Sequence, residues 1–181
     1  MRKVIVSTMA TANAVIESPQ RWSFEYMTED LMQYVFDQLF DADALIMGRV
    51  TYEGFAEAWP TRAGADDFAD RINSLPKYVA SRTLQEPLIW NASLLKGDVA
   101  GQVAQLKQQP GESILQYGLG ELTYTLIQSG LVDELRLLVY PVVISGPNIF
   151  AAFDQTTLKL LETKVFASGV VALHYQPASA Q

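Results

Sequence analysis

Cysteine is absent from this 181-residue chain, and histidine occurs only once, as His174. Without cysteine the chain has no disulfide, no thiolate nucleophile and no cysteine-ligated zinc. A single histidine cannot build a multi-histidine metal site, so we expect no metal, and a Ser-His-Asp hydrolase would have to use His174. That residue lies in an alternating segment near the C-terminus, which favours a strand histidine without a role in catalysis.

Excess positive charge and long apolar runs are also missing. The 20 acidic side chains outnumber the 13 lysines and arginines, which gives a net charge of −7. An acidic chain repels phosphate backbones, so nucleic acid is a poor choice of partner. The apolar run at the N-terminus is too short for a signal peptide, and no stretch approaches the roughly 20 apolar residues of a membrane span. We therefore expect a soluble, cytoplasmic protein.

What the chain does contain is enough apolar sequence for a core, since 49% of its residues are hydrophobic. No repeat, linker or change of composition divides it, so we expect a single domain over residues 1–181. Apolar and turn patterns predict strands at 3–8, 44–47, 77–80, 88–90, 113–117, 134–144, 158–166 and 170–176. They predict helices from Thr28 (with apolar positions Leu31, Val35, Leu39 and Ala42), at 51–59, within 61–75, at 98–108 and at 121–129.

The order of these elements predicts an α/β fold. Strands that alternate with helices indicate a mostly parallel sheet with helices on both faces. The two last strands are joined by Ser168-Gly169, which indicates a C-terminal antiparallel hairpin at the sheet edge. The long apolar run 135–144 fits either the middle of the sheet or a dimer face, and the core position is favoured.

Three predicted strand ends carry residues suited to binding an anion. Ligands of open α/β sheets bind outside the carboxyl ends of the strands, where helix N-termini present free N–H groups. The residues concerned are Gly48, Arg49 and Thr51 after the second strand, Ser81 and Arg82 after the third, and Gly118, Leu119, Gly120 and Glu121 after strand 113–117.

Each of these segments alone is equally compatible with an ordinary turn, and 118–123 is not a full G-x-G-x-x-G because residue 123 is threonine. Together they fit a long, multiply charged ligand such as a dinucleotide. Two arginines favour a cofactor with a 2′-phosphate, because NAD sites typically use an acidic residue instead. Asn13, after the first strand, either faces a ligand or is a turn residue.

Several of these segments resemble one family. Residues 45–60, LIMGRVTYEGFAEAWP, are similar to a "GRxTYEGF…WP" signature, and LPKYVASRTL at 75–84 is similar to the strand and turn that follow it. YGLGEL at 117–122 resembles a "GSGxL" turn, and LVDEL at 131–135 with YPVV at 140–143 and Phe150 resembles a later "LVDEL…PVxLGxG…LF" run. The family comprises the reductase domains of bifunctional riboflavin-biosynthesis deaminase-reductases and their stand-alone, dihydrofolate-reductase-like relatives.

This resemblance implies a dihydrofolate-reductase-like sheet, NADPH as hydride donor and a homodimer. By position it implies that Gly48, Arg49 and Thr51 hold cofactor phosphate and that Ser81 and Arg82 hold the 2′-phosphate. It implies further that residues 118–121 surround the pyrophosphate. The deaminase half is absent, because the chain has neither its H-x-E motif nor any cysteine.

The chain departs from the family pattern at three loops. Asn13-Ala14 replaces an Asp-Gly whose aspartate faces the substrate, and an amide cannot transfer a proton as a carboxyl does. Glu17 first and Glu25 second are therefore candidate proton donors, with solvated surface as the alternative for each. Leu119 replaces a serine between the glycines, and Ser145-Gly146-Pro147 alters the loop after the long strand.

Three functions follow from these observations. The first is hydride transfer from NADPH to a small polar substrate, resembling 5-amino-6-(5-phosphoribosylamino)uracil reductase, with Asn13 and Glu17 as candidate catalytic residues. The second is NADP binding with little or no catalysis, which the missing aspartate favours. The third is dihydrofolate reduction. Activity on dihydrofolate separates the third from the others.

Overall fold

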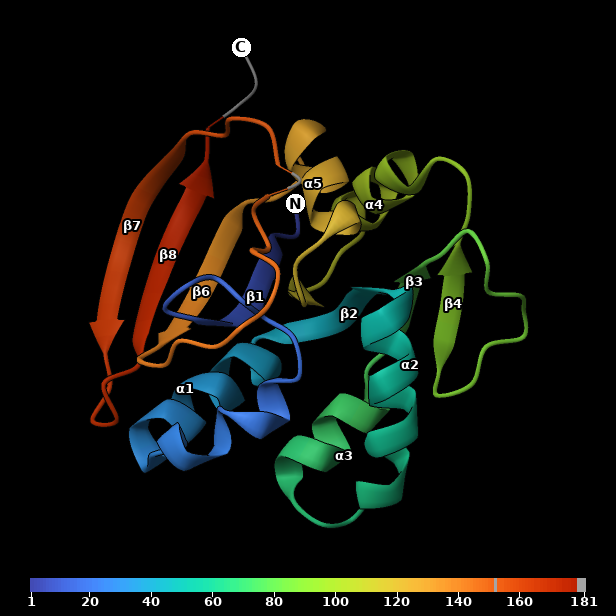
Figure 1. Ribbon diagram of the computed structural model, residues 1–181. Helices are drawn as coiled ribbons and strands as arrows, with labels where there is room; N and C mark the ends of the chain where they lie inside the picture. Colours follow the sequence, from blue (N-terminus) through green and yellow to red (C-terminus); the bar gives the residue numbers. More distant parts are fainter. Residues whose placement is uncertain (152, 179–181) are drawn as a thin grey trace.

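The computed structural model describes residues 1–151 and 153–178 (Figure 1). The strands are β1 Val4–Thr11, β2 Ala42–Gly48, β3 Lys77–Ala80, β4 Ala92–Leu95, β5 Ser113–Tyr117, β6 Glu134–Tyr140, β7 Leu158–Val165 and β8 Val171–Pro177. The α-helices are α1 Glu29–Phe40, α2 Arg49–Ala58, α3 Asp67–Ser74, α4 Val99–Gln108 and α5 Glu121–Gln128. Within these described residues, no helix is long and apolar enough to cross a membrane.

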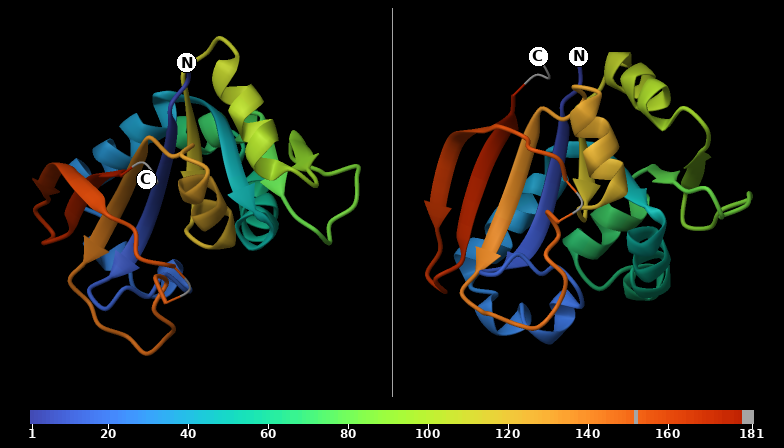
Figure 2. Two further views of the ribbon diagram at one scale, coloured as in Figure 1. Left: turned by 90° about the horizontal axis from the view of Figure 1, so that it is seen from above. Right: turned by 45° about the horizontal axis from the view of Figure 1, so that its top comes forward.

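All the described strands belong to one sheet, in the order β4-β3-β2-β5-β1-β6-β8-β7. The neighbours from β4 to β6 pair in parallel, and β8 pairs antiparallel with both β6 and β7. The twisted sheet and its C-terminal hairpin are seen from two further directions in Figure 2. The predicted α/β fold is confirmed, and β6 lies inside the sheet between β1 and β8.

Helices cover both faces of the sheet because successive strand residues point to opposite sides. In β2, Ala44 and Ile46 pack with α4 and α5, whereas Leu45 and Met47 pack with α1, α2 and α3. The same alternation continues in β5, where Ile114 faces the first layer and Leu115 the second. The molecule therefore has helices on both faces of the sheet (Figure 1), and apolar clusters lie between the sheet and each layer of helices.

One predicted strand is wrong. Residues 88–90 are not in the sheet, and β4 lies later, at Ala92–Leu95. The Tyr52 hydroxyl donates to the carbonyl of Ile89 and accepts from its N–H, both at 3.1 Å, so a side chain takes the bonds that a neighbouring strand would need. Trp90 and Asn91 follow with φ of 61° and 51°, a left-handed conformation that interrupts an extended chain.

Most predicted boundaries differ from the structure by one or two residues, and three of the differences have a clear physical meaning. Ala42 was expected on the first helix but begins β2, because α1 ends at Phe40. β6 ends at Tyr140 rather than 144, where its partner β1 ends and Pro141 has no N–H for a ladder. β1 runs to Thr11, beyond the predicted residue 8. His174 lies in a strand as expected, where its Nε2 is 2.5 Å from the Tyr34 hydroxyl.

Lys77, the first residue of β3, is a fully buried cation. Its side chain has 0% exposure, its Nζ donates to the carbonyl oxygen of Asn73 at 2.7 Å, and it lies 4.2 Å from the centre of the Trp90 ring. Burial lowers the pKa of Lys77 from 10.5 to about 8, because removing the ammonium from water penalises its charged form. The fold thus contains a lysine whose charge opposes folding near neutral pH.

Candidate functional site

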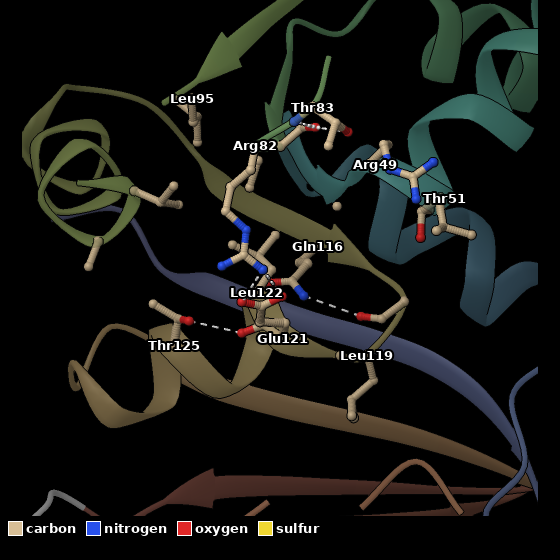
Figure 3. A pocket seen from close by; sticks show the side chains of 18 of the residues that line it. Arg49, Thr51, Arg82, Thr83, Leu95, Gln116, Leu119, Glu121, Leu122 and Thr125 are labelled. Carbon is tan, nitrogen blue, oxygen red and sulfur yellow. Dashed lines mark hydrogen bonds and ion pairs between the residues drawn. The ribbon is translucent and has the colours of Figure 1, made fainter. Parts of the chain in front are cut away.

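A pocket of about 670 Å³ opens at the carboxyl ends of β2, β3 and β5 (Figure 3). This volume is within the range of small-molecule binding sites. All nine residues predicted to bind a cofactor line it: Gly48, Arg49, Thr51, Ser81, Arg82, Gly118, Leu119, Gly120 and Glu121. Three segments that are separate in sequence therefore meet at one edge of the sheet.

Helix N-termini form two of the pocket walls. Helix α2 begins after Gly48 and α5 begins after Gly120, so neither N-cap supplies a capping side chain, although the N–H of Gly120 donates to the Thr123 hydroxyl at 3.4 Å. The free N–H groups and the partial positive charge of a helix N-terminus stabilise an anion. By contrast, Asp98 caps α4, since its carboxylate accepts from the N–H of Gly101 at 2.9 Å. Of the three helix N-termini that line the pocket, those of α2 and α5 thus fit an anionic ligand better than that of α4.

The turn between β5 and α5 depends on its glycines. Gly118 has a φ of +82°, and a Cβ on it would lie 2.8 Å from the Thr51 hydroxyl. Gly48 and Gly120 instead face open space, because a Cβ at either position would meet no non-adjacent atom of the described chain within 4 Å. Gly118 therefore lets the turn approach α2 closely. Gly48 and Gly120 leave backbone accessible within the pocket.

Gln116 holds this turn from beneath. Its side chain is buried, and its amide nitrogen donates to the Thr123 hydroxyl at 2.6 Å and to the carbonyl of Gly118 at 3.2 Å. The N–H of Gly118 donates in turn to the carbonyl of Ser7 in β1, at 3.3 Å. The position of the turn is therefore fixed by the sheet on one side and by α5 on the other.

Both arginines of the pocket are paired with carboxylates. Arg49 contacts Glu53, one turn further along α2, at 2.9 Å, and Arg82 contacts Glu121 at 2.8 Å. Glu53 does not line the pocket, whereas Glu121 does. Because all four side chains are substantially exposed, these pairs are weak and exchangeable.

Ser81 forms the turn after β3. Its hydroxyl oxygen accepts from the N–H groups of Thr83 and Leu84, at 3.1 and 3.0 Å. The Ser81 hydroxyl also lies 3.4 Å from the Thr83 hydroxyl, so the two hydroxyl groups share a hydrogen bond at this turn.

The two predicted catalytic residues lie outside this pocket lining. The Asn13 carbonyl oxygen accepts from the Thr11 hydroxyl at 2.8 Å and from the N–H of Ile144 at 3.3 Å, and its amide donates to the carbonyl of Ile144 at 2.7 Å. The side chain therefore joins the end of β1 to the segment after β6. Glu17 is exposed, and among the described residues its backbone carbonyl accepts from the indole N–H of Trp22 at 3.0 Å. A catalytic role for either residue stays a prediction.

One wall of the pocket was missed at the sequence level. It consists of the end of β4 and the start of α4, and the residues concerned are Leu95, Gly97, Asp98, Val99 and Ala100. The sequence signal for this wall is Gly97 followed by Asp98, a glycine and a helix N-cap residue directly after a strand. Because the strand was expected at 88–90, these residues were not recognised as another strand end.

Comparisons with known proteins give a consistent result. The family described as "RibD C-terminal domain" matches residues 2–172, which is nearly the whole chain. The uncharacterized protein YyaP of Bacillus subtilis is 31% identical over 179 residues, covering 96% of this chain and 94% of that protein.

Solved structures show the same fold at low identity. A putative riboflavin biosynthesis protein from Shewanella sp. PV-4 superposes with a TM-score of 0.75 at 19% identity, covering 97% of this chain and 99% of that one. A pyrimidine reductase-like protein from Corynebacterium diphtheriae gives 0.63 at 13% identity, covering 99% and 93%. A deaminase/5-amino-6-(5-phosphoribosylamino)uracil reductase from Thermotoga maritima gives 0.65 at 13% identity, covering 98% of this chain and 57% of that one.

Proposed function

Because the chain belongs to the RibD C-terminal domain family, we propose that it is an NADPH-dependent reductase acting on a small polar substrate. Its reaction resembles the reduction performed by 5-amino-6-(5-phosphoribosylamino)uracil reductases. The observation that carries the proposal is the convergence of nine residues, chosen from three strand ends in the sequence, on one pocket.

The pocket residues fit a dinucleotide phosphate. Gly48 and Gly120 leave room for a ligand to approach backbone, and the α2 and α5 N-termini favour negative charge. In this proposal Arg49 and the backbone N–H groups of the turn 118–121 hold the pyrophosphate, and the side chains of Ser81 and Arg82 hold the 2′-phosphate. The bound dinucleotide supplies the hydride, and the protein orients it and excludes water.

The substrate side of the proposal lies beyond the β5–α5 turn, at the carboxyl ends of β1 and β6. Asn13 fixes the two loops there to one another and thereby shapes that end of the site. An amide can orient a substrate, whereas proton transfer needs a titratable group. Glu17 is the candidate donor in this proposal, because it is an exposed carboxylate on the loop that Asn13 anchors.

Calorimetric titration of NADPH and NADH into the purified protein tests the proposal. We expect NADPH to bind with a dissociation constant at least tenfold below that of NADH, because only NADPH carries a 2′-phosphate for Arg82. Absence of binding by either dinucleotide would sink the reductase hypothesis. If NADPH binds, its oxidation is followed first with 5-amino-6-(5-phosphoribosylamino)uracil and then with dihydrofolate.

Each substrate result supports one of the three functions considered above. Turnover of the uracil derivative supports the proposal, and turnover of dihydrofolate alone supports a dihydrofolate reductase. Binding without oxidation on either substrate, or on related pyrimidines, supports a non-catalytic NADP-binding protein. The engagement of the Asn13 amide by Ile144 is the observation that favours this last alternative.

We also propose that the protein is a homodimer that pairs through β7. This strand is at the edge of the sheet, and it exposes Leu160, Leu161 and Val165 by 51%, 47% and 69%. An edge strand that exposes apolar side chains beside unpaired backbone groups offers a surface for a second copy of itself about a two-fold axis.

Light scattering during size-exclusion chromatography tests the dimer. We expect twice the monomer mass for the unchanged protein and the monomer mass for Leu161→Lys, which places a charge on the edge. Ile89→Lys is the matched control, because Ile89 is 67% exposed on a loop away from β7. A monomer mass for the unchanged protein would contradict the proposal.

A further inference from the structure

The ion pair between Arg82 and Glu121 spans the pocket. Arg82 follows β3, Glu121 is the first residue of α5, and the guanidinium is 2.8 Å from a carboxylate oxygen. Figure 3 shows the arginine side chain reaching from one wall of the pocket to the other. The two side chains are 83% and 71% exposed, so a ligand can reach either partner.

This pair differs in one respect from that of Arg49. Glu53, the partner of Arg49, lies outside the pocket lining, so a ligand phosphate at Arg49 does not meet that carboxylate within the pocket. Glu121 lies inside the lining, next to Arg82. A phosphate that binds Arg82 therefore either displaces Glu121 or binds the remaining guanidinium N–H groups beside its negative charge.

A carboxylate and a guanidinium select opposite forms of an adenosine ribose. A carboxylate accepts a hydrogen bond from a free 2′-hydroxyl, whereas an arginine binds a 2′-phosphate. Dinucleotide sites commonly use one or the other. Here the two groups are in contact at one position, and their exposed pairing is weak enough to be exchanged for a ligand.

We propose that Glu121 is a specificity-determining residue that reduces the preference of this pocket for the 2′-phosphorylated dinucleotide. The inference rests on the proposed function, since it concerns the same pocket and ligand. Glu121 acts in two ways: its carboxylate holds Arg82 away from a 2′-phosphate, and it offers an acceptor to the 2′-hydroxyl of NADH. The protein therefore uses both dinucleotides, with NADPH preferred.

Substituting Glu121→Gln keeps the size of the side chain and removes its charge. We expect NADPH to bind about fivefold more tightly and NADH about threefold more weakly, so that the ratio of the two dissociation constants rises by roughly an order of magnitude. Calorimetry measures both constants, and a thermal scan verifies that the variant is folded.

Glu53→Gln is the matched control, because it removes the same charge from another carboxylate paired with an arginine. It should leave the ratio of dissociation constants within twofold of the original. An equal rise in both variants would overturn the proposal, since it would indicate a general effect of net charge. A second variant, Arg82→Gln, should weaken NADPH binding alone and bring the ratio close to one.

The outcomes separate this inference from the proposed function. If the unchanged protein binds NADPH and Glu121→Gln leaves the ratio unchanged or lowers it, the role of Glu121 is wrong while the dinucleotide pocket stands. If the unchanged protein binds neither dinucleotide, the proposed function fails and this inference fails with it. A selective rise in Glu121→Gln supports both.

Discussion

Gly118→Ala should weaken NADPH binding by at least tenfold and lower the free energy of unfolding by about 2 kcal/mol. A side chain at a φ of +82° costs roughly 1–2 kcal/mol in backbone strain. The added methyl group would also lie 2.8 Å from the Thr51 hydroxyl, so either the Thr51 side chain rotates or α2 and the turn move apart. Both segments line the pocket, and their separation would disrupt it. Calorimetry and chemical denaturation measure the two effects.

The control Gly64→Ala separates the backbone strain from the steric contact with Thr51. Gly64 also has a positive φ, +78°, but nothing lies within 4 Å of a Cβ at that position, which is outside the pocket lining. This control should lose about the same backbone energy and keep its affinity for NADPH. Combining Gly118→Ala with Thr51→Ala should restore part of the lost stability, because the hydroxyl in the collision is removed. Equal affinities in Gly118→Ala and the unchanged protein would contradict this explanation.

Lys77 should make the protein more stable as the pH rises from 8 to 10. Its pKa is about 8 in the folded state and 10.5 as a free side chain, so the unfolded chain binds more protons in this interval. Stability increases with pH wherever the unfolded state binds the extra proton, and the gain from Lys77 between pH 8 and pH 10 is about 2 kcal/mol. Below pH 8 both states are protonated, and the cost of the buried charge is fully present.

Above pH 10 the tyrosines reverse this trend. Burial raises the pKa of Tyr34 and of Tyr140 to about 12, so the folded state retains protons that the unfolded chain loses. By the same relation, stability falls between pH 10 and 12. We therefore expect the contribution of these groups to be greatest near pH 10.

The variant Lys77→Met isolates the contribution of the lysine. It keeps an unbranched side chain over Trp90 and removes the titrating group, so the rise between pH 8 and 10 should disappear from its unfolding free energies. Lys96→Met, at an exposed lysine, is the control and should keep the rise. Parallel pH curves for Lys77→Met and the unchanged protein would show that the charge of Lys77 does not oppose folding.

Most of the sheet could be predicted because its strands bury both faces. Residues 77–80 and 113–117 coincide with β3 and β5, since a short apolar run between turn residues has one strong interpretation. The exception, 88–90, is also a short apolar run. What decides against a strand there is the distant Tyr52 hydroxyl, which occupies both backbone groups of Ile89. A contact over 37 positions leaves no trace in the local pattern.

The candidate site, like the sheet, was predictable where the signal is local and not where it depends on a distant contact. Its glycines and arginines were found because each follows a strand end, where local sequence carries the signal. The pairing of Arg82 with Glu121 was not, because it joins residues 39 positions apart that are brought together only when β3 and β5 align. The use of Asn13 to bind Ile144 was hidden for the same reason, with a separation of 131 positions.

The two helical layers described above share few contacts except through the sheet. The pocket is an exception, because α2 belongs to one layer and α4 and α5 to the other, and all three contribute to its lining. A ligand that touches all of them restrains the layers relative to one another, so its binding energy is linked to the unfolding of both cores. Slow amide hydrogen exchange would then report occupancy on both faces of the sheet, including at positions that the ligand never touches.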